Sequence, residues 1–179
     1  MEISENLLRE LVERVMELTL ENSGQREKKK SVLVVLAGED AARFLETLRA
    51  LNAGGDCEIT TALSRDQIND ETIGNMVCSE SRKIVEMRQV LKRPLPYDRI
   101  IFPVMPREIL AKCALCIPDT DEVRIVQRAL EEHVPVSVAK NGLDPFTGNE
   151  PEPYQKQVLE YVRRLLEYGI DIQMDEKER

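Results

Sequence analysis

Hydrophobic positions along the chain predict strands that alternate with helices. Residues 31–37 (SVLVVLA) form a continuous aliphatic run, which is typical of a strand buried on both faces of a parallel sheet. Residues 41–52 then place apolar side chains at helical spacing, and residues 57–63 (CEITTAL) indicate a second strand. Because a helix joins two parallel strands in this arrangement, we expect a right-handed β-α-β unit.

The alternation continues to the end of the chain, with a weaker pattern over residues 64–96. There, residues 72–78 and 81–92 have helical spacing, and residues 93–96 form a loop with two prolines. The later elements are predicted to be a strand within 97–104, helices at 107–116 and 122–132, a strand at 134–139, a long loop at 141–153 and an amphipathic helix at 154–168. The sequence therefore predicts an α/β fold with a parallel sheet of four strands.

The chain divides into three segments. Residues 1–30 contain an amphipathic helix at 4–22, which Ser4 can cap, and a polar linker. Residues 31–150 form the α/β core, and residues 151–179 hold the C-terminal helix and a tail that we expect to fray. The first helix is expected to dock on the core or on a neighbouring subunit.

Composition fits an ordered globular protein. The chain has 179 residues, of which 42% are hydrophobic and 32% charged, enough for one core without disulfides. Its formal net charge of -8 disfavours nucleic acid as a partner, and the basic run Lys28, Lys29 and Lys30 is interpreted as part of the solvated linker. No apolar stretch is long enough for a membrane span and no signal core is present, so a cytoplasmic location without membrane contact is predicted.

Four cysteines do not suggest a disulfide framework in a chain of this length, and we expect reduced thiols. Cys113 and Cys116 form a C-A-L-C pair near the end of a predicted helix. A redox C-x-x-C pair normally lies in the first turn of a helix, whereas this pair lies near the end of one. Packing of the two thiols in the core is therefore favoured, and redox exchange or ligation of a cluster is the alternative. The scattered cysteines and one histidine do not support a metal site.

Three loops follow the carboxyl ends of predicted strands, where ligands bind in open parallel sheets. They contain Gly38, Glu39 and Asp40, then Ser64 and Arg65, then the segment from Pro103 through Val104, Met105 and Pro106 to Arg107. The chain has neither G-x-G-x-x-G nor G-x-x-x-x-G-K-[ST], the motifs of dinucleotide and nucleoside triphosphate sites. Flavin mononucleotide (FMN) needs neither, because one helix amino terminus can hold a single phosphate. The three loops are therefore candidate FMN contacts. The alternative for the third loop is that Pro103 and Pro106 only end the preceding strand.

The run PVMPREILAKCALCIPD at residues 103–119 resembles the signature of the flavoprotein superfamily named for homo-oligomeric flavin-containing cysteine decarboxylases. The matching residues, in order, are Pro103, Met105, Ala111, Lys112, Ala114, Ile117 and Asp119. Residues 138–146 (VAKNGLDPF) and the ending YVRRLLEYGIDI are similar to the flavoproteins encoded with bacterial microcompartments. The dipicolinate synthase B subunit is a more distant resemblance.

This resemblance implies a Rossmann-like, flavodoxin-type three-layer fold. It also implies FMN bound between subunits of a homo-oligomer, a trimer or a multiple of trimers, with Lys112 among the candidate cofactor contacts. The implied function is an oxidoreductase, transferring electrons or hydride in a microcompartment pathway, with shell proteins or enzymes of the compartment as partners. The helix at residues 4–22 is likewise similar to the tags that direct cargo into such shells.

Two alternatives stay open: a flavin-dependent decarboxylase or synthase subunit acting on a small carboxylated substrate, and a scaffold or cargo adaptor that has lost flavin. The superfamily's glycine is replaced by Cys116, and its early catalytic histidine is missing, since the chain has only His133. Catalytic residues are therefore left unassigned.

Several candidate residues also have structural interpretations. The Glu39-Asp40 pair is predicted to cap the helix at 41–52, and Asp119, Thr120 or Asp121 is predicted to cap the helix at 122–132. Lys112 can meet a phosphate or an acidic neighbour, or be a solvated helix residue, and Met105 can pack either on the flavin or in the core.

Overall fold

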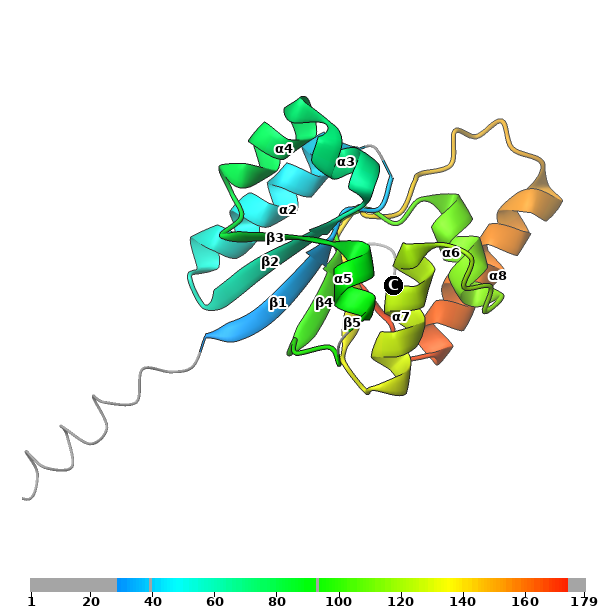
Figure 1. Ribbon diagram of the computed structural model, residues 1–179. Helices are drawn as coiled ribbons and strands as arrows, with labels where there is room; N and C mark the ends of the chain where they lie inside the picture. The colour runs from blue at the N-terminus through cyan, green and yellow to red at the C-terminus, as the bar shows by residue number, and fades with distance from the viewer. Residues whose placement is uncertain (1–28, 39, 93, 174–179) are drawn as a thin grey trace, which may run out of the picture.

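The computed structural model describes residues 29–38, 40–92 and 94–173, and their centre is a parallel sheet in the order β3-β2-β1-β4-β5-β6 (Figure 1). The strands are β1 (Lys30–Val35), β2 (Cys57–Leu63), β3 (Lys83–Glu86), β4 (Arg99–Phe102), β5 (Val136–Val138) and β6 (Asp171–Ile172). This order is that of the doubly wound Rossmann fold, in which the chain builds one half of the sheet outward from β1 and then the other half from β4.

Helices cover both faces of the sheet and complete a three-layer α/β fold (Figure 1). The helices are α2 (Ala41–Gly54), α3 (Arg65–Asn69), α4 (Glu71–Cys78), α5 (Met87–Leu91), α6 (Arg107–Ala114), α7 (Asp121–Glu131) and α8 (Glu152–Glu167). Side chains of α2 and α4 pack on one face, and those of α5, α6, α7 and α8 pack on the other. The predicted fold class is confirmed.

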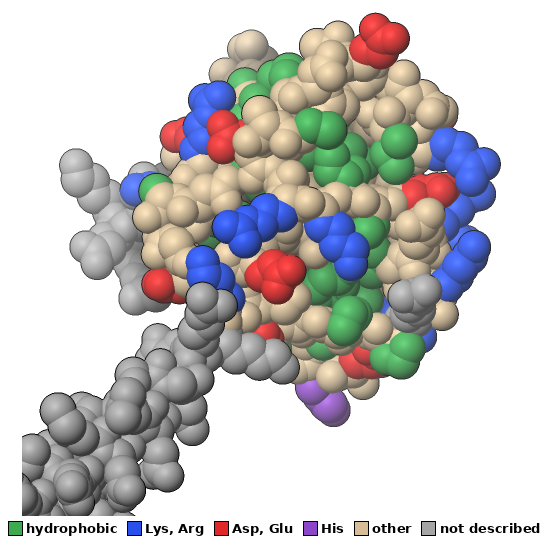
Figure 2. Space-filling view, turned by 60° about the vertical axis from the view of Figure 1, so that its left-hand side comes forward, with side chains coloured by type: hydrophobic (Ala, Val, Ile, Leu, Met, Phe, Trp, Pro, Cys, Tyr) green, Lys and Arg blue, Asp and Glu red, His purple; other side chains and the backbone are tan. Residues whose placement is uncertain are grey.

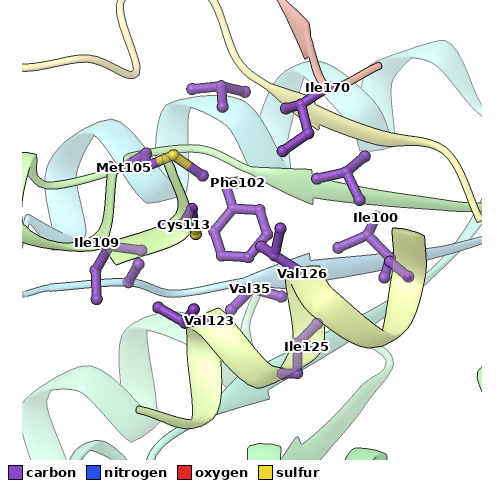
Figure 3. Packing of buried hydrophobic residues seen from close by; sticks show 14 of the residues in the cluster. Val35, Ile100, Phe102, Met105, Ile109, Cys113, Val123, Ile125, Val126 and Ile170 are labelled. Carbon is purple, nitrogen blue, oxygen red and sulfur yellow. The ribbon is translucent and has the colours of Figure 1, made fainter. Parts of the chain in front are cut away.

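Alternation along β1 explains why this strand forms one apolar run in the sequence. Val32 and Val34 point to the layer of α2, whereas Leu33 and Val35 point to the layer of α6 and α7. All four side chains are buried. Figure 3 shows the second layer, where Phe102 of β4 lies among side chains of α6 and α7. The prediction of a strand buried on both faces is confirmed.

The predicted helix at residues 81–92 is wrong in its first half. Residues Lys83–Glu86 form β3, whose Ile84 and Val85 pair in parallel with Thr61 and Ala62 of β2, and only Met87–Leu91 are helical. Four residues are too few for a periodic pattern to separate strand from helix, so pairing with β2 decides the outcome. The sheet also gains β6, which pairs with β5.

Two predictions fall on residues that the structure does not describe: the helix at residues 4–22 and the fraying tail at 175–179. Within the described part of the chain, no helix is both long and apolar enough to cross a membrane.

Candidate functional site

The order of the sheet reverses between β1 and β4, and the loops after these two strands meet at its carboxyl edge. Gly38, after β1, has a φ of 79° and faces Pro106, after β4. A Cβ atom on Gly38 would lie 2.9 Å from Cγ of Pro106, so both the backbone conformation and the close approach require glycine. Ligands of doubly wound sheets bind at this reversal point, which makes the Gly38–Pro106 contact the centre of the candidate site.

The loop after β2 joins the same edge through Ser64 and Gln67. The Ser64 hydroxyl accepts from the Gln67 backbone N–H at 3.3 Å, and the Ser64 N–H donates to Gln67 Oε1 at 2.9 Å, which forms a capping box at the start of α3. Gln67 Nε2 also donates to the Gly38 carbonyl at 2.8 Å. One side chain therefore links two of the three predicted loops.

Residues 141–151, between β5 and α8, cross this edge, and we call them the strap. Met105 N–H donates to the Gly142 carbonyl at 2.8 Å, and a bridge pairs Met105 with Leu143. A Cβ atom on Gly142 would lie 2.8 Å from each of three atoms, the carbonyl oxygens of Ala139 and Pro103 and Cγ1 of Val138. The strap is therefore seated tightly on the loop after β4.

Arg43, in the first turn of α2, ties the loop after β1 to the strap. Its guanidinium lies 2.6 Å from a carboxylate oxygen of Asp40 and 2.9 Å from one of Asp144, and it donates to the Asn141 carbonyl at 3.1 Å. The Arg43 backbone N–H also donates to Asp40, which lowers the pKa of that carboxyl group together with the Arg43 side chain. Asp40 is therefore the cap of α2, as predicted.

Arg107, the first residue of α6, holds the middle of the strap. Its guanidinium donates to the Pro145 carbonyl at 2.7 Å, lies 3.3 Å from Glu150 Oε1, and lies 5.0 Å from the centre of the Phe146 ring and 5.9 Å from that of Tyr154. Its Nε atom is buried and has no hydrogen-bond partner among the described residues. A buried N–H without an acceptor is costly, so this atom is a point of unsatisfied hydrogen bonding at the start of α6.

Glu150 keeps its charge through contacts within the strap. Its carboxylate accepts backbone N–H groups of Thr147 and Gly148 at 3.0 Å. These bonds, with the Arg107 guanidinium, lower the pKa of Glu150 to about 2. The strap is therefore held at two points by arginines that face carboxylates.

The structure brings most of the predicted residues to this edge, although not all of them face outward. Gly38, Asp40, Ser64 and Pro106 are partly exposed, and Arg65 is exposed beside Glu86 at 3.3 Å. Pro103, Val104 and Met105 are buried, and Figure 3 shows the Met105 side chain in the core near Phe102. The core interpretation of Met105 is thus the one observed. Glu39 lies outside the described residues.

Lys112, in contrast, lies toward the far end of α6. Its ammonium group is 3.2 Å from the Asp119 carboxylate, so it is an ion-paired residue and not a freely solvated one. Of the three residues predicted to cap α7, Thr120 is confirmed, because its hydroxyl accepts from the Val123 N–H, and Asp119 is not the cap. Five residues of helix separate Lys112 from Arg107, about 8 Å along the axis. Lys112 therefore does not join the other candidate contacts.

Cys116 occupies a position that favours glycine for a local reason. Its φ is 55°, and α6 ends with bonds from Ile117 N–H to the Lys112 carbonyl and from Cys116 N–H to the Cys113 carbonyl. This pattern is a Schellman motif, whose left-handed residue is usually glycine. Because this end of α6 points away from the carboxyl edge, the cysteine affects how the helix ends and does not bear on how closely a ligand approaches.

Replacing Cys116 with glycine is expected to raise the free energy of unfolding by about 0.5–1 kcal/mol, because glycine adopts the left-handed conformation without steric cost. The same change at Cys78, the last residue of α4, should lower it by a similar amount, because glycine weakens a right-handed helix. Urea unfolding of both variants checks the pair. A loss of stability in both would contradict the role of the Cys116 backbone.

Thiols and histidine do not add chemistry to the site. Cys113 is buried in the core, and burial raises the pKa of its thiol to about 12, which agrees with the packing interpretation. The only histidine of the chain, His133, is exposed in the turn before β5 (purple in Figure 2). That turn leads into the amino end of a strand, opposite the candidate site. Among the described residues, no three His, Cys, Asp or Glu side chains gather to hold a metal ion.

Sequence reasoning missed three residues that shape the site: Arg43, Gln67 and Gly142. Only Gln67 had a local signal, because S-x-x-Q before a helix is the pattern of a capping box. Arg43 and Gly142 also have near neighbours, Asp40 and Ala139, but their distant partners Asp144 and Pro103 have no local signal in the sequence.

No family model and no curated protein match the chain. Solved flavoproteins share its fold. The FMN-dependent cysteine decarboxylase TvaF of thioviridamide biosynthesis has a TM-score of 0.62 and 14% identity, covering 84% of this chain and 92% of that one. A dodecameric FMN-dependent UbiX-like decarboxylase from Escherichia coli O157:H7 has a TM-score of 0.61 and 16% identity, covering 79% and 77%.

The dipicolinate synthase B subunit from Bacillus halodurans has a TM-score of 0.59 and 16% identity, covering 80% of this chain and 75% of that one. At these identities the likeness establishes the fold, and function has to be argued from the site.

Proposed function

We propose that this chain binds FMN at the carboxyl edge of its sheet and works as a flavin-dependent enzyme. The observation that carries the proposal is the start of α6. There Pro106 supplies no side-chain cap, and the buried Nε of Arg107 lacks an acceptor. Support also comes from the shared fold of structures described as FMN-dependent.

The donor groups at the start of α6 suit a phosphate. The first N–H groups of a helix have no partner inside it, and the helix dipole favours negative charge there. At the start of α2, by contrast, the Asp40 carboxylate already accepts from a backbone N–H of the first turn. The residues present therefore fit FMN with its phosphate held by the α6 backbone and Arg107.

Other residues of the edge fit the uncharged parts of FMN. The Ser64 hydroxyl accepts from Gln67 and keeps its own proton as a donor for a ribityl hydroxyl. The backbone of Gly38 lies at the same edge, packed against Pro106. When bound, the flavin supplies the electron-transfer chemistry, and the protein binds and orients it.

Decarboxylation is the reaction that the similar structures favour, since TvaF and the UbiX-like protein are both described as FMN-dependent decarboxylases. Electron or hydride transfer in a microcompartment stays a prediction from sequence resemblance. The dodecameric neighbour supports a homo-oligomer, for which we propose trimers or multiples of trimers.

Titration of the flavin-free full chain with FMN tests the proposal. We expect quenching of flavin fluorescence with one FMN bound per chain, and binding of riboflavin, which lacks the phosphate, at least about tenfold weaker. Equal affinity for FMN and riboflavin would contradict the proposed phosphate site at the start of α6. Absence of fluorescence quenching would contradict the proposed flavin function and favour the alternative of a scaffold without flavin.

Carbon dioxide release from the FMN-loaded protein separates the two enzymatic functions. Suitable substrates are peptides that end in cysteine and small aryl-acrylic acids, by analogy with the reactions named for the similar structures. Release above a flavin-free control would support decarboxylation. Flavin binding without release from either class would favour electron transfer.

A further inference from the structure

Gln67 uses its whole side chain to connect two loops of the site. Its Oε1 accepts from Ser64 N–H at 2.9 Å, and its Nε2 donates to the carbonyls of Gly38 at 2.8 Å and Leu36 at 3.4 Å. These contacts reach from α3 to the loop after β1, about 30 residues earlier in the chain.

The packing of helix α3 does not explain why the Gln67 side chain makes several hydrogen bonds. It has five residues, none of them buried, so core packing does not fix its position. The Oε1 atom is enough to complete the capping box. The Nε2 atom is therefore available for a separate task, which is to hold the loop after β1.

Gly38 is a residue whose backbone conformation matters for the site. It has a left-handed backbone and its Cα lies against Pro106 at the point where the sheet order reverses. Because a peptide unit is planar, a donor on its carbonyl fixes the orientation of the backbone that follows the strand. Without the donor, the carbonyl can turn toward water and the loop can leave Pro106.

We propose that Gln67 is a positioning residue of this site: by donating to the Gly38 carbonyl, it keeps the loop after β1 in the shape that accepts the cofactor. The inference rests on the proposed FMN function, because it names a residue that supports the same site without touching the ligand. The two ends of the Gln67 side-chain amide therefore have different roles. Oε1 caps the start of α3 through Ser64, and Nε2 anchors the loop after β1 through Gly38.

The substitution Gln67→Glu separates these roles. A glutamate keeps the capping oxygen and loses the donor, so it presents a charged oxygen to the Gly38 carbonyl. We expect FMN to bind the full-length variant about tenfold more weakly, with a changed visible circular dichroism of the bound flavin. Thermal unfolding of the flavin-free protein should stay within about 3 °C of wild type.

Gln127→Glu is the matched control, because Gln127 lies exposed on α7 and donates only to the neighbouring Glu131. Its FMN affinity should equal that of wild type. As a second variant, Gln67→Ala removes both roles and should also weaken FMN binding, with a larger loss of thermal stability.

Wild-type affinity and an unchanged flavin spectrum in Gln67→Glu would overturn the role of Gln67 while leaving the FMN site intact. Absence of FMN binding by the wild-type chain would instead overturn the proposed function, and the inference with it. A large loss of flavin-free stability in Gln67→Glu would show a structural role only and would overturn the positioning role.

Discussion

Replacing Gly142 with alanine is expected to lower the free energy of unfolding by about 3 kcal/mol, in the upper range for forcing a methyl group into a packed site. The new methyl group would lie 2.8 Å from two carbonyl oxygens and a valine methyl group. The oxygens belong to the backbone of Pro103 and Ala139 and cannot rotate away. Relief requires the strap to lift, which breaks the bond from Met105 N–H to the Gly142 carbonyl.

Urea unfolding of the full chain measures this loss, and FMN affinity should fall in the same variant because the strap borders the proposed site. Gly74→Ala provides the control. Gly74 lies within α4, where an added Cβ would have only ordinary contact at 3.9 Å, so alanine should stabilise the protein by about 0.5–1 kcal/mol. A loss below about 1 kcal/mol for Gly142→Ala would contradict the tight seating of the strap.

Replacing Arg107 with methionine is expected to weaken FMN binding roughly 30-fold, which corresponds to about 2 kcal/mol for hydrogen bonds to a charged group. Methionine keeps most of the length and packing of the side chain but removes every donor. The variant therefore loses the unpartnered Nε and the guanidinium that offsets the charge of Glu150. Glu150 itself should stay in place, because backbone N–H groups of the strap continue to bind it.

Fluorescence titration with FMN measures the effect, and Arg107→Lys adds information. Lysine restores the charge without the planar fork of donors, so its affinity should lie between those of wild type and the methionine variant. Arg163→Met serves as the control, because Arg163 is an exposed residue of α8 whose partners, Glu160 and Glu167, belong to the same helix. Equal FMN affinity in wild type and Arg107→Met would exclude Arg107 from the site.

The local pattern of the sequence determined the parts of the fold that depend on near neighbours. The runs of aliphatic and β-branched residues predicted β1 and β2 within one or two residues, because strands buried on both faces of a parallel sheet have this composition. The cap by Asp40 was also readable, because the start of a helix depends on residues within one turn. The three loops at the carboxyl edge followed from the order of strands and helices alone.

Tertiary structure decided how these loops fit together. Gly38 meets Pro106, Arg43 meets Asp144, and Arg107 meets Glu150 across tens of residues, and no local pattern encodes such contacts. It also decided that the Met105 side chain points into the core and that Lys112 lies toward the other end of α6. The sequence placed both in one signature, but a helix carries successive residues away from its start, and only the packed fold shows which of them remain at the site.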